Sequence, residues 1–129
     1  APHTDPAVVA WARERELACI PGAATPTEML AAHRAGAPVV KLFPGQADGP
    51  GWVRSVLGPL SFLKILPTSG VTLDNAAEYL RAGAFAVGFV NCLFEPEDLA
   101  AGRFDVVRER ARRMVAAVRD GVGRGALSA

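Results

Sequence analysis

The chain has 129 residues, of which 50% are hydrophobic and 21% charged, and its net charge at pH 7 is +1. These values are those of one soluble domain, and so small a net charge gives no reason to expect nucleic-acid binding. No apolar run approaches the roughly 18 residues that a membrane-spanning helix needs, and no secretory signal is expected. Cys19 and Cys92 are too few for a disulfide framework and have no companion metal ligands, so we expect reduced thiols, a cytoplasmic protein, no metal and no cofactor.

A short apolar run, a loop and a helix-like stretch recur along the chain. Pro21, Pro44 and Pro67 are spaced 23 residues apart, and each follows such a run. The expected strands are residues 17–20, 39–43, 63–66 and 84–90. Short, nearly continuous apolar runs are typical of strands covered on both faces, and their alternation with helices predicts a parallel sheet.

Capping residues mark the expected helix starts, and glycines mark the expected ends. The starts lie at Asp5-Pro6, at Thr25-Pro26-Thr27-Glu28, which has the pattern of a capping box, and at Thr72-Leu73-Asp74. The ends lie at Gly36 and Gly83, where a helix can finish in a left-handed residue. A last amphipathic helix is expected over about 104–119, and a flexible tail over 121–129.

Four such units amount to about half of a closed (β/α)8 barrel, which has eight units and about 200 or more residues. The stub Ala1-Pro2 fits the end of an earlier strand. We therefore predict an α/β fold of parallel (β/α) units, in which residues 1–120 form a (β/α)4-like portion of a TIM-type barrel.

Lys41 is distinctive because the chain otherwise favours arginine. Of 14 basic residues only two are lysine, and Lys41 lies in the otherwise apolar run 37–44. Arginine stays protonated at working pH, whereas an amine in an apolar pocket can become neutral and attack a carbonyl. Side-chain alternation puts Val39, Lys41 and Phe43 on one face, which we expect to point into the barrel. The alternative is a lysine whose ammonium reaches water or pairs with a carboxylate.

The loop 67–70 follows the third expected strand, at the sheet edge where parallel α/β folds bind ligands. Backbone N–H groups before the next helix suit phosphate or carboxylate, although many loops of this kind have a similar composition. We expect Lys64 to be a polar residue of the barrel interior or bottom layer, and His33 to lie at the surface. The arginines concentrated between residues 103 and 124 are expected to form a solvated helix face, with a surface for an acidic partner as the alternative.

Four segments, IPGAATPTE at 20–28, VKLFP at 40–44, LPTSGVTLDN at 66–75 and EDLAAG at 97–102, carry a resemblance that extends from residue 2 to about 118. Together they resemble the C-terminal part of the 2-keto-3-deoxy-6-phosphogluconate / 4-hydroxy-2-oxoglutarate aldolase family. The resemblance implies a class I aldolase on a (β/α)8 barrel, usually trimeric, that cleaves a 2-keto-3-deoxy sugar acid to pyruvate and an aldehyde. It assigns the Schiff-base lysine to Lys41, and the substrate-binding positions to Phe43, Thr68, Ser69, Gly70 and Asn91.

Three positions depart from the family pattern. The family's general acid/base glutamate belongs to an early strand that this chain does not contain, and Glu28 is a helix-capping residue. Ser69 and Val90 stand where the family has glycines, and a Cβ at either position would crowd a backbone that must approach phosphate. These departures leave room for a smaller, unphosphorylated acid.

The sequence thus favours an aldolase that acts on a 2-keto-3-deoxy(-6-phospho) sugar acid or 4-hydroxy-2-oxoglutarate, and that is incomplete as 129 residues. Its expected partners are a small keto acid and either the missing N-terminal half-barrel or further copies of itself, as a homo-oligomer. One alternative is a non-catalytic half-barrel that serves as an interaction or assembly module. Another is a phosphate-binding barrel protein of a different family, with Lys41 as a counter-charge.

Overall fold

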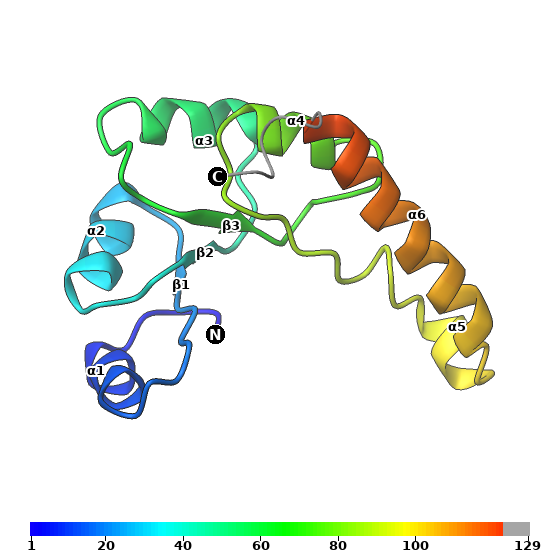
Figure 1. The fold of residues 1–129 in the computed structure, drawn as a ribbon, viewed down its shortest axis with the longest axis horizontal. Helices are drawn as coiled ribbons and strands as arrows, with labels where there is room; N and C mark the ends of the chain where they lie inside the picture. Colours follow the sequence, from blue (N-terminus) through cyan, green and yellow to red (C-terminus); the bar gives the residue numbers. More distant parts are fainter. Residues whose placement is uncertain (123–129) are drawn as a thin grey trace.

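The computed structural model describes residues 1–122, in which short parallel strands alternate with helices (Figure 1). The strands are β1 (Gly22–Ala23), β2 (Val40–Leu42) and β3 (Ile65–Pro67). The helices are α1 (Pro6–Glu14), α2 (Pro26–Arg34), α3 (Pro50–Leu57), α4 (Ala76–Arg81), α5 (Pro96–Ala100) and α6 (Phe104–Val122). None of the helices in this part of the chain is both long and apolar enough to span a membrane.

The sheet has the strand order β1-β2-β3, and both pairings are parallel. Lys41 lies between Gly22 on β1 and Leu66 on β3. Because β2 is the central strand, its residues have neighbours on both sides. Lys41 is therefore placed by both pairings, which leaves little freedom in its register.

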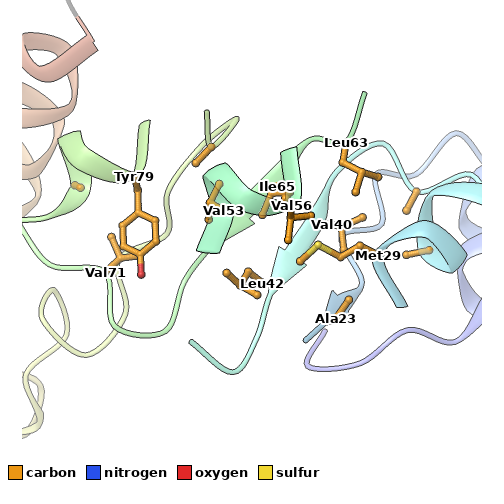
Figure 2. Close-up of a cluster of buried hydrophobic side chains, with 14 of the residues drawn as sticks. Ala23, Met29, Val40, Leu42, Val53, Val56, Leu63, Ile65, Val71 and Tyr79 are labelled. Carbon is orange, nitrogen blue, oxygen red and sulfur yellow. The ribbon is translucent and has the colours of Figure 1, made fainter. Parts of the chain in front are cut away.

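One face of the sheet is the hydrophobic core. Val40, Leu42 and Ile65 are each at most 1% exposed, and Figure 2 shows them clustered with side chains of α2 and α3. The helix residues of this cluster are Met29, Val53 and Val56. Burial of these apolar side chains is what holds three such short strands together, since strands of two or three residues contribute few backbone hydrogen bonds.

The opposite face of the sheet is open. Alternation along β2 turns Lys41 and Phe43 away from the core, and Phe43 is 37% exposed. Lys64 and Phe85 lie on the same open side, where the Lys64 ammonium nitrogen is 5.0 Å from the centre of the Phe85 ring. This face corresponds to the interior of a closed barrel, as the sequence predicts for Lys41.

The predicted helix boundaries at the first two helices are confirmed. The Asp5 carboxylate accepts the Ala7 N–H at 2.8 Å, before α1. At α2 the Thr25 hydroxyl accepts the Glu28 N–H at 3.3 Å, and the Glu28 carboxylate accepts the Thr25 N–H at 2.9 Å, which completes the capping box. Gly36 and Gly83 follow α2 and α4 with φ of 100° and 103°, as expected for residues that end a helix.

The predicted first strand, residues 17–20, is wrong, because the sheet begins at Gly22. The outer neighbour of β1 is the short N-terminal stub, in which Ala1 bonds to Ile20 and His3 and Thr4 bond to Gly22. The Gly22 N–H donates to the His3 carbonyl at 3.2 Å, and the Thr4 hydroxyl donates to the Gly22 carbonyl at 2.9 Å. With so short a partner on one side, the ladder does not extend back to residues 17–20.

The predicted fourth strand, residues 84–90, is an irregular extended segment. It bonds to β3 through the Phe85 N–H, which donates to the Ile65 carbonyl at 2.9 Å, and the Gly88 N–H, which donates to the Pro67 carbonyl at 2.9 Å. Two bonds spaced in this way do not make a regular ladder, and no further strand within residues 1–122 pairs with the far side of the segment. The chain therefore follows the path of a fourth strand without its regular geometry.

Two further boundaries differ from the sequence expectation. The helix expected near Thr72 begins at Ala76, because the Asn75 side chain accepts the Thr72 N–H at 2.8 Å and holds residues 72–75 in a turn. Helix α6 continues through residues 121 and 122, where the flexible tail was expected to begin. The remainder of that expected tail, residues 123–129, lies outside the described residues.

We expect Leu42→Ala to lower the free energy of unfolding by about 2–5 kcal/mol, because it removes a fully buried side chain from the core. Urea unfolding followed by circular dichroism measures this change. The matched control is Leu17→Ala, since Leu17 is 54% exposed and its loss should change stability by less than about 0.5 kcal/mol. Equal effects of the two substitutions would contradict the described core.

The capping box also predicts a pH dependence of stability. Hydrogen bonds from the Ala24 and Thr25 N–H groups lower the pKa of Glu28 below its ordinary value. A carboxyl group whose pKa is lowered by folding stabilises the folded state above its unfolded pKa, and this contribution is lost as the pH falls through the folded pKa. The stability difference between the wild type and Glu28→Gln should therefore be present at neutral pH and vanish in acid; a difference independent of pH would argue against the ionised cap.

Candidate active site

A pocket of about 300 Å³ lies at the carboxyl ends of β2 and β3. It is lined by residues from three consecutive loops and strand ends: Lys41, Phe43, Thr68, Ser69, Gly70, Val71, Thr72, Val90, Asn91 and Cys92. All six residues that the sequence predicts for the site therefore meet in one place. Their roles in chemistry stay predictions.

Lys41 reaches the pocket from the central strand. Its ammonium nitrogen lies 4.9 Å from the centre of the Phe43 ring, two residues further along β2. The side chain is half-buried, and within residues 1–122 no carboxylate oxygen lies within the 4.0 Å of an ion pair. Among the described residues, Lys41 therefore has no carboxylate partner, in contrast to one of the alternatives that the sequence left open.

Thr68 presents an unused hydroxyl at the pocket. Its Oγ1 is buried, and it has no hydrogen-bond partner among the described residues. Gly88 packs directly against it, because a Cβ built on Gly88 would lie 2.8 Å from the Thr68 methyl carbon. Buried polar atoms are nearly always paired in folded proteins, so an orphan hydroxyl in a pocket is a position that a ligand can satisfy.

The loop after β3 offers backbone donors. Within residues 1–122, the N–H groups of Ser69, Gly70 and Val71 donate to no protein acceptor. Gly70 has a φ of 78°, and its carbonyl accepts the Asn75 side-chain amide at 2.9 Å, which fixes the loop. The N–H groups thus suit an anion. The sequence analysis expected them to lie directly before a helix, but a turn separates them from the N-terminus of α4.

The neighbouring loops close around this one. A Cβ on Gly45 would lie 2.5 Å from the Ser69 carbonyl oxygen, so the loop after β2 packs against the loop after β3 with no room for a side chain. On the other side the Cys92 thiol donates to the Val71 carbonyl at 3.3 Å. Sequence analysis predicted only a reduced thiol for Cys92, although its position next to Asn91 was a signal that it shares the pocket.

The other residues singled out in the sequence lie outside the pocket. Lys64 is exposed on the open face and does not line the cavity, and His33 is exposed with its ring 5.0 Å from that of Phe62. No cluster of His, Cys, Asp and Glu that could hold a metal ion occurs within residues 1–122.

The pocket lining contains no aspartate, glutamate or histidine from the described part of the chain. Proton transfer to or from a substrate needs a group of suitable pKa within hydrogen-bond reach. The pocket therefore has an amine, a hydroxyl, a thiol and backbone donors, but no carboxylate or imidazole from the described residues to act as general acid or base.

These features define a class of protein: part of a TIM-type barrel, with an amine on a strand and anion-compatible loops at the carboxyl edge of a parallel sheet. The sequence model of the KDPG and KHG aldolase family matches residues 1–109, and the chain belongs to this family. The predicted α/β fold with parallel strands, covering part of a TIM-type barrel, is confirmed.

Individual relatives agree with this assignment. A probable 2-dehydro-3-deoxy-6-phosphogalactonate aldolase of Rhizobium meliloti is 36% identical over 90% of this chain and 53% of its own length. A native KDPGal structure is 28% identical, with a TM-score of 0.86 over 95% of this chain and 58% of that one. A cube-shaped, porous cage designed by fusing symmetric oligomeric domains is 29% identical, with a TM-score of 0.83 over 93% of this chain and 43% of that one. The chain spans about half the length of the curated relatives it matches.

The backbone of the pocket loop gives a direct test. Gly70→Ala should lower the free energy of unfolding by about 1–2 kcal/mol, because its φ of 78° is unfavourable for a residue with a Cβ even though nothing crowds the site. Gly58→Ala should instead stabilise by about 0.4–1 kcal/mol, since Gly58 has helical φ and ψ. Chemical denaturation measures both, and effects of the same sign would contradict the described loop conformation.

Proposed function

We propose that the protein is a class I aldolase, which cleaves a 2-keto-3-deoxy sugar acid or 4-hydroxy-2-oxoglutarate to pyruvate and an aldehyde through a Schiff base on Lys41. The observation that carries this proposal is the shared pocket of the Lys41 amine and the unpaired Thr68 hydroxyl. Membership of the aldolase family supports the reaction class.

The chemistry follows from the amine. Neutral Lys41 attacks the ketone carbon of the keto acid, and loss of water gives an iminium ion. The C4 hydroxyl gives its proton to a base as the C3–C4 bond breaks, and the electron pair of that bond moves toward the iminium nitrogen, so an enamine forms and the aldehyde leaves. A proton then adds to the enamine carbon, and water hydrolyses the regenerated iminium to release pyruvate and free Lys41.

The surrounding groups suit the substrate. The Phe43 ring lies beside the Lys41 amine, 4.9 Å from its nitrogen, and supplies an apolar surface for the carbon chain of a small acid. We assign the Thr68 hydroxyl to the bound keto acid, and the N–H groups of Ser69 and Gly70 to its carboxylate or phosphate. Asn91 contributes an amide to the pocket lining. The Ser69 side chain narrows this end of the pocket, so a small, unphosphorylated acid remains a candidate substrate.

Catalysis on this scheme needs a group that the described residues do not supply. Proton transfer requires an acid or base, and the described pocket lining contains no carboxylate or imidazole for it. The open face leaves Phe85 56% exposed, and beside it an apolar groove of about 640 Å³ runs between residues 84–93 and α6. We assign this surface to a complementary half-barrel, which either a further segment or a second copy of this chain provides, and which brings the missing base.

The proposed Schiff base can be trapped. Incubation with pyruvate and borohydride should give a reduced pyruvate adduct on Lys41, located by peptide mass mapping. Lys41→Arg should abolish the adduct, because a guanidinium does not form the iminium. Lys64→Arg is the matched control, since Lys64 lies outside the pocket lining, and it should leave the adduct intact. Absence of the wild-type adduct, or its location on Lys64, would refute the assignment.

A second candidate function is a non-catalytic assembly module, which the open face and the apolar groove favour. Sedimentation velocity, combined with the trapping experiment, distinguishes the assembly module from the aldolase. Stable association without a pyruvate adduct supports the module, and an adduct supports the aldolase. The alternative of a phosphate-binding barrel protein of a different family is wrong, because the chain belongs to the KDPG and KHG aldolase family.

A further inference from the structure

A buried ion-pair network lies behind one wall of the pocket. Asp98 on α5 is 5% exposed and is the one buried charged residue among residues 1–122. Its carboxylate accepts a hydrogen bond from Arg103 Nε at 2.8 Å and another from Arg110 Nη2 at 2.8 Å. The two guanidinium groups, Arg110 foremost, lower the pKa of Asp98, so the carboxylate is held in its charged form.

The two arginines differ in what else they bind. Arg110 donates from Nη1 to the Leu93 carbonyl at 2.9 Å, and its Nη2 lies 3.2 Å from a Glu95 carboxylate oxygen. Its side chain is 17% exposed, against 46% for Arg103. Arg110 therefore connects Asp98 to residues 93–95, whereas the recorded side-chain contact of Arg103 is to Asp98. The expectation that the arginines of α6 are simply solvated is wrong for Arg110.

The segment that Arg110 holds carries two pocket residues. The N–H groups of Leu93 and Phe94 donate to the Val90 carbonyl at 3.0 and 2.9 Å, so residues 90–94 form a tight turn. Asn91 and Cys92, within this turn, line the pocket. A displacement of the Leu93 carbonyl is therefore transmitted through one peptide unit to the pocket wall.

We propose that Asp98 and Arg110 are positioning residues, which hold the turn 90–94 where Asn91 and Cys92 form one wall of the keto-acid pocket. The identity of the bound acid rests on the proposed function. The planar guanidinium suits this task because it donates to two acceptors in fixed directions, the Asp98 carboxylate and the Leu93 carbonyl. A lysine in place of Arg110 cannot reproduce this fork.

Thiol labelling tests the proposal without requiring catalysis. The Cys92 thiol is half-buried and bonded to the Val71 carbonyl, so a disulfide reagent such as dithiobis(nitrobenzoate) should label it faster when the turn opens. Cys19 is half-buried against the core, remote in sequence from the turn, and serves as an internal reference. Peptide mass mapping gives the two labelling rates separately.

The decisive comparison is between Arg110→Lys and Arg103→Lys, because each changes an arginine at 2.8 Å from Asp98 but only Arg110 reaches the turn. Arg110→Lys should raise the Cys92 labelling rate several-fold and leave the Cys19 rate unchanged, and Arg103→Lys should leave both near the wild-type rate. Asp98→Asn, a second variant of nearly equal size, should also accelerate Cys92 selectively.

Three outcomes overturn the proposal: an unchanged Cys92 rate in Arg110→Lys, equal effects of the two arginine variants, or parallel acceleration of Cys92 and Cys19. If both thiols are labelled faster, for example because the variant unfolds completely, the network contributes to the stability of the whole fold and not to the position of the turn. In the pyruvate experiment, Arg110→Lys should raise the pyruvate concentration that half-saturates trapping, and Arg103→Lys should not. If the wild type traps no pyruvate, the proposed function fails, while the ratio of the two thiol rates still decides the positioning role.

Discussion

Side chains alternate along β2, and this alternation places core residues on one face of the strand and candidate site residues on the other. Val40 and Leu42 are almost fully buried beneath the helices, so the strand cannot rotate or slip by one residue without exposing both. Lys41 and Phe43 are consequently fixed on the other face. Burial of apolar side chains on one face of the strand thus determines where the Lys41 amine points on the other face. No ion pair with the described residues holds this amine.

The pocket around that amine depends on close backbone contacts between consecutive loops. Gly45 and Gly88 let their segments approach Ser69 and Thr68, respectively, at distances that exclude a side chain. The Cys92 thiol then links the last loop to the one before it. The backbone N–H groups of the pocket are therefore carried by closely packed segments, an arrangement that lowers the entropic cost of binding a ligand.

The same structure is open where a barrel would be closed. The face that carries Lys41 also carries exposed Phe85, and the groove beside α6 is apolar. The chain spans about half the length of its curated relatives, and its pocket lining contains no carboxylate or imidazole within the described residues. The proposed function therefore requires further strands that cover these surfaces and enclose the site in a medium of low dielectric constant.

Sequence alone determined the features that depend on neighbours within about four residues or on periodicity. These are the caps at Asp5 and Thr25, the glycine ends of two helices, the alternation in β2 and the parallel α/β class. The family motif added the six pocket positions. Tertiary structure alone decided where the first strand begins, that residues 84–90 are irregular, and that Arg110 is drawn from a helix surface to Asp98 and Leu93. These outcomes depend on partners distant in sequence, whose presence local propensity does not encode.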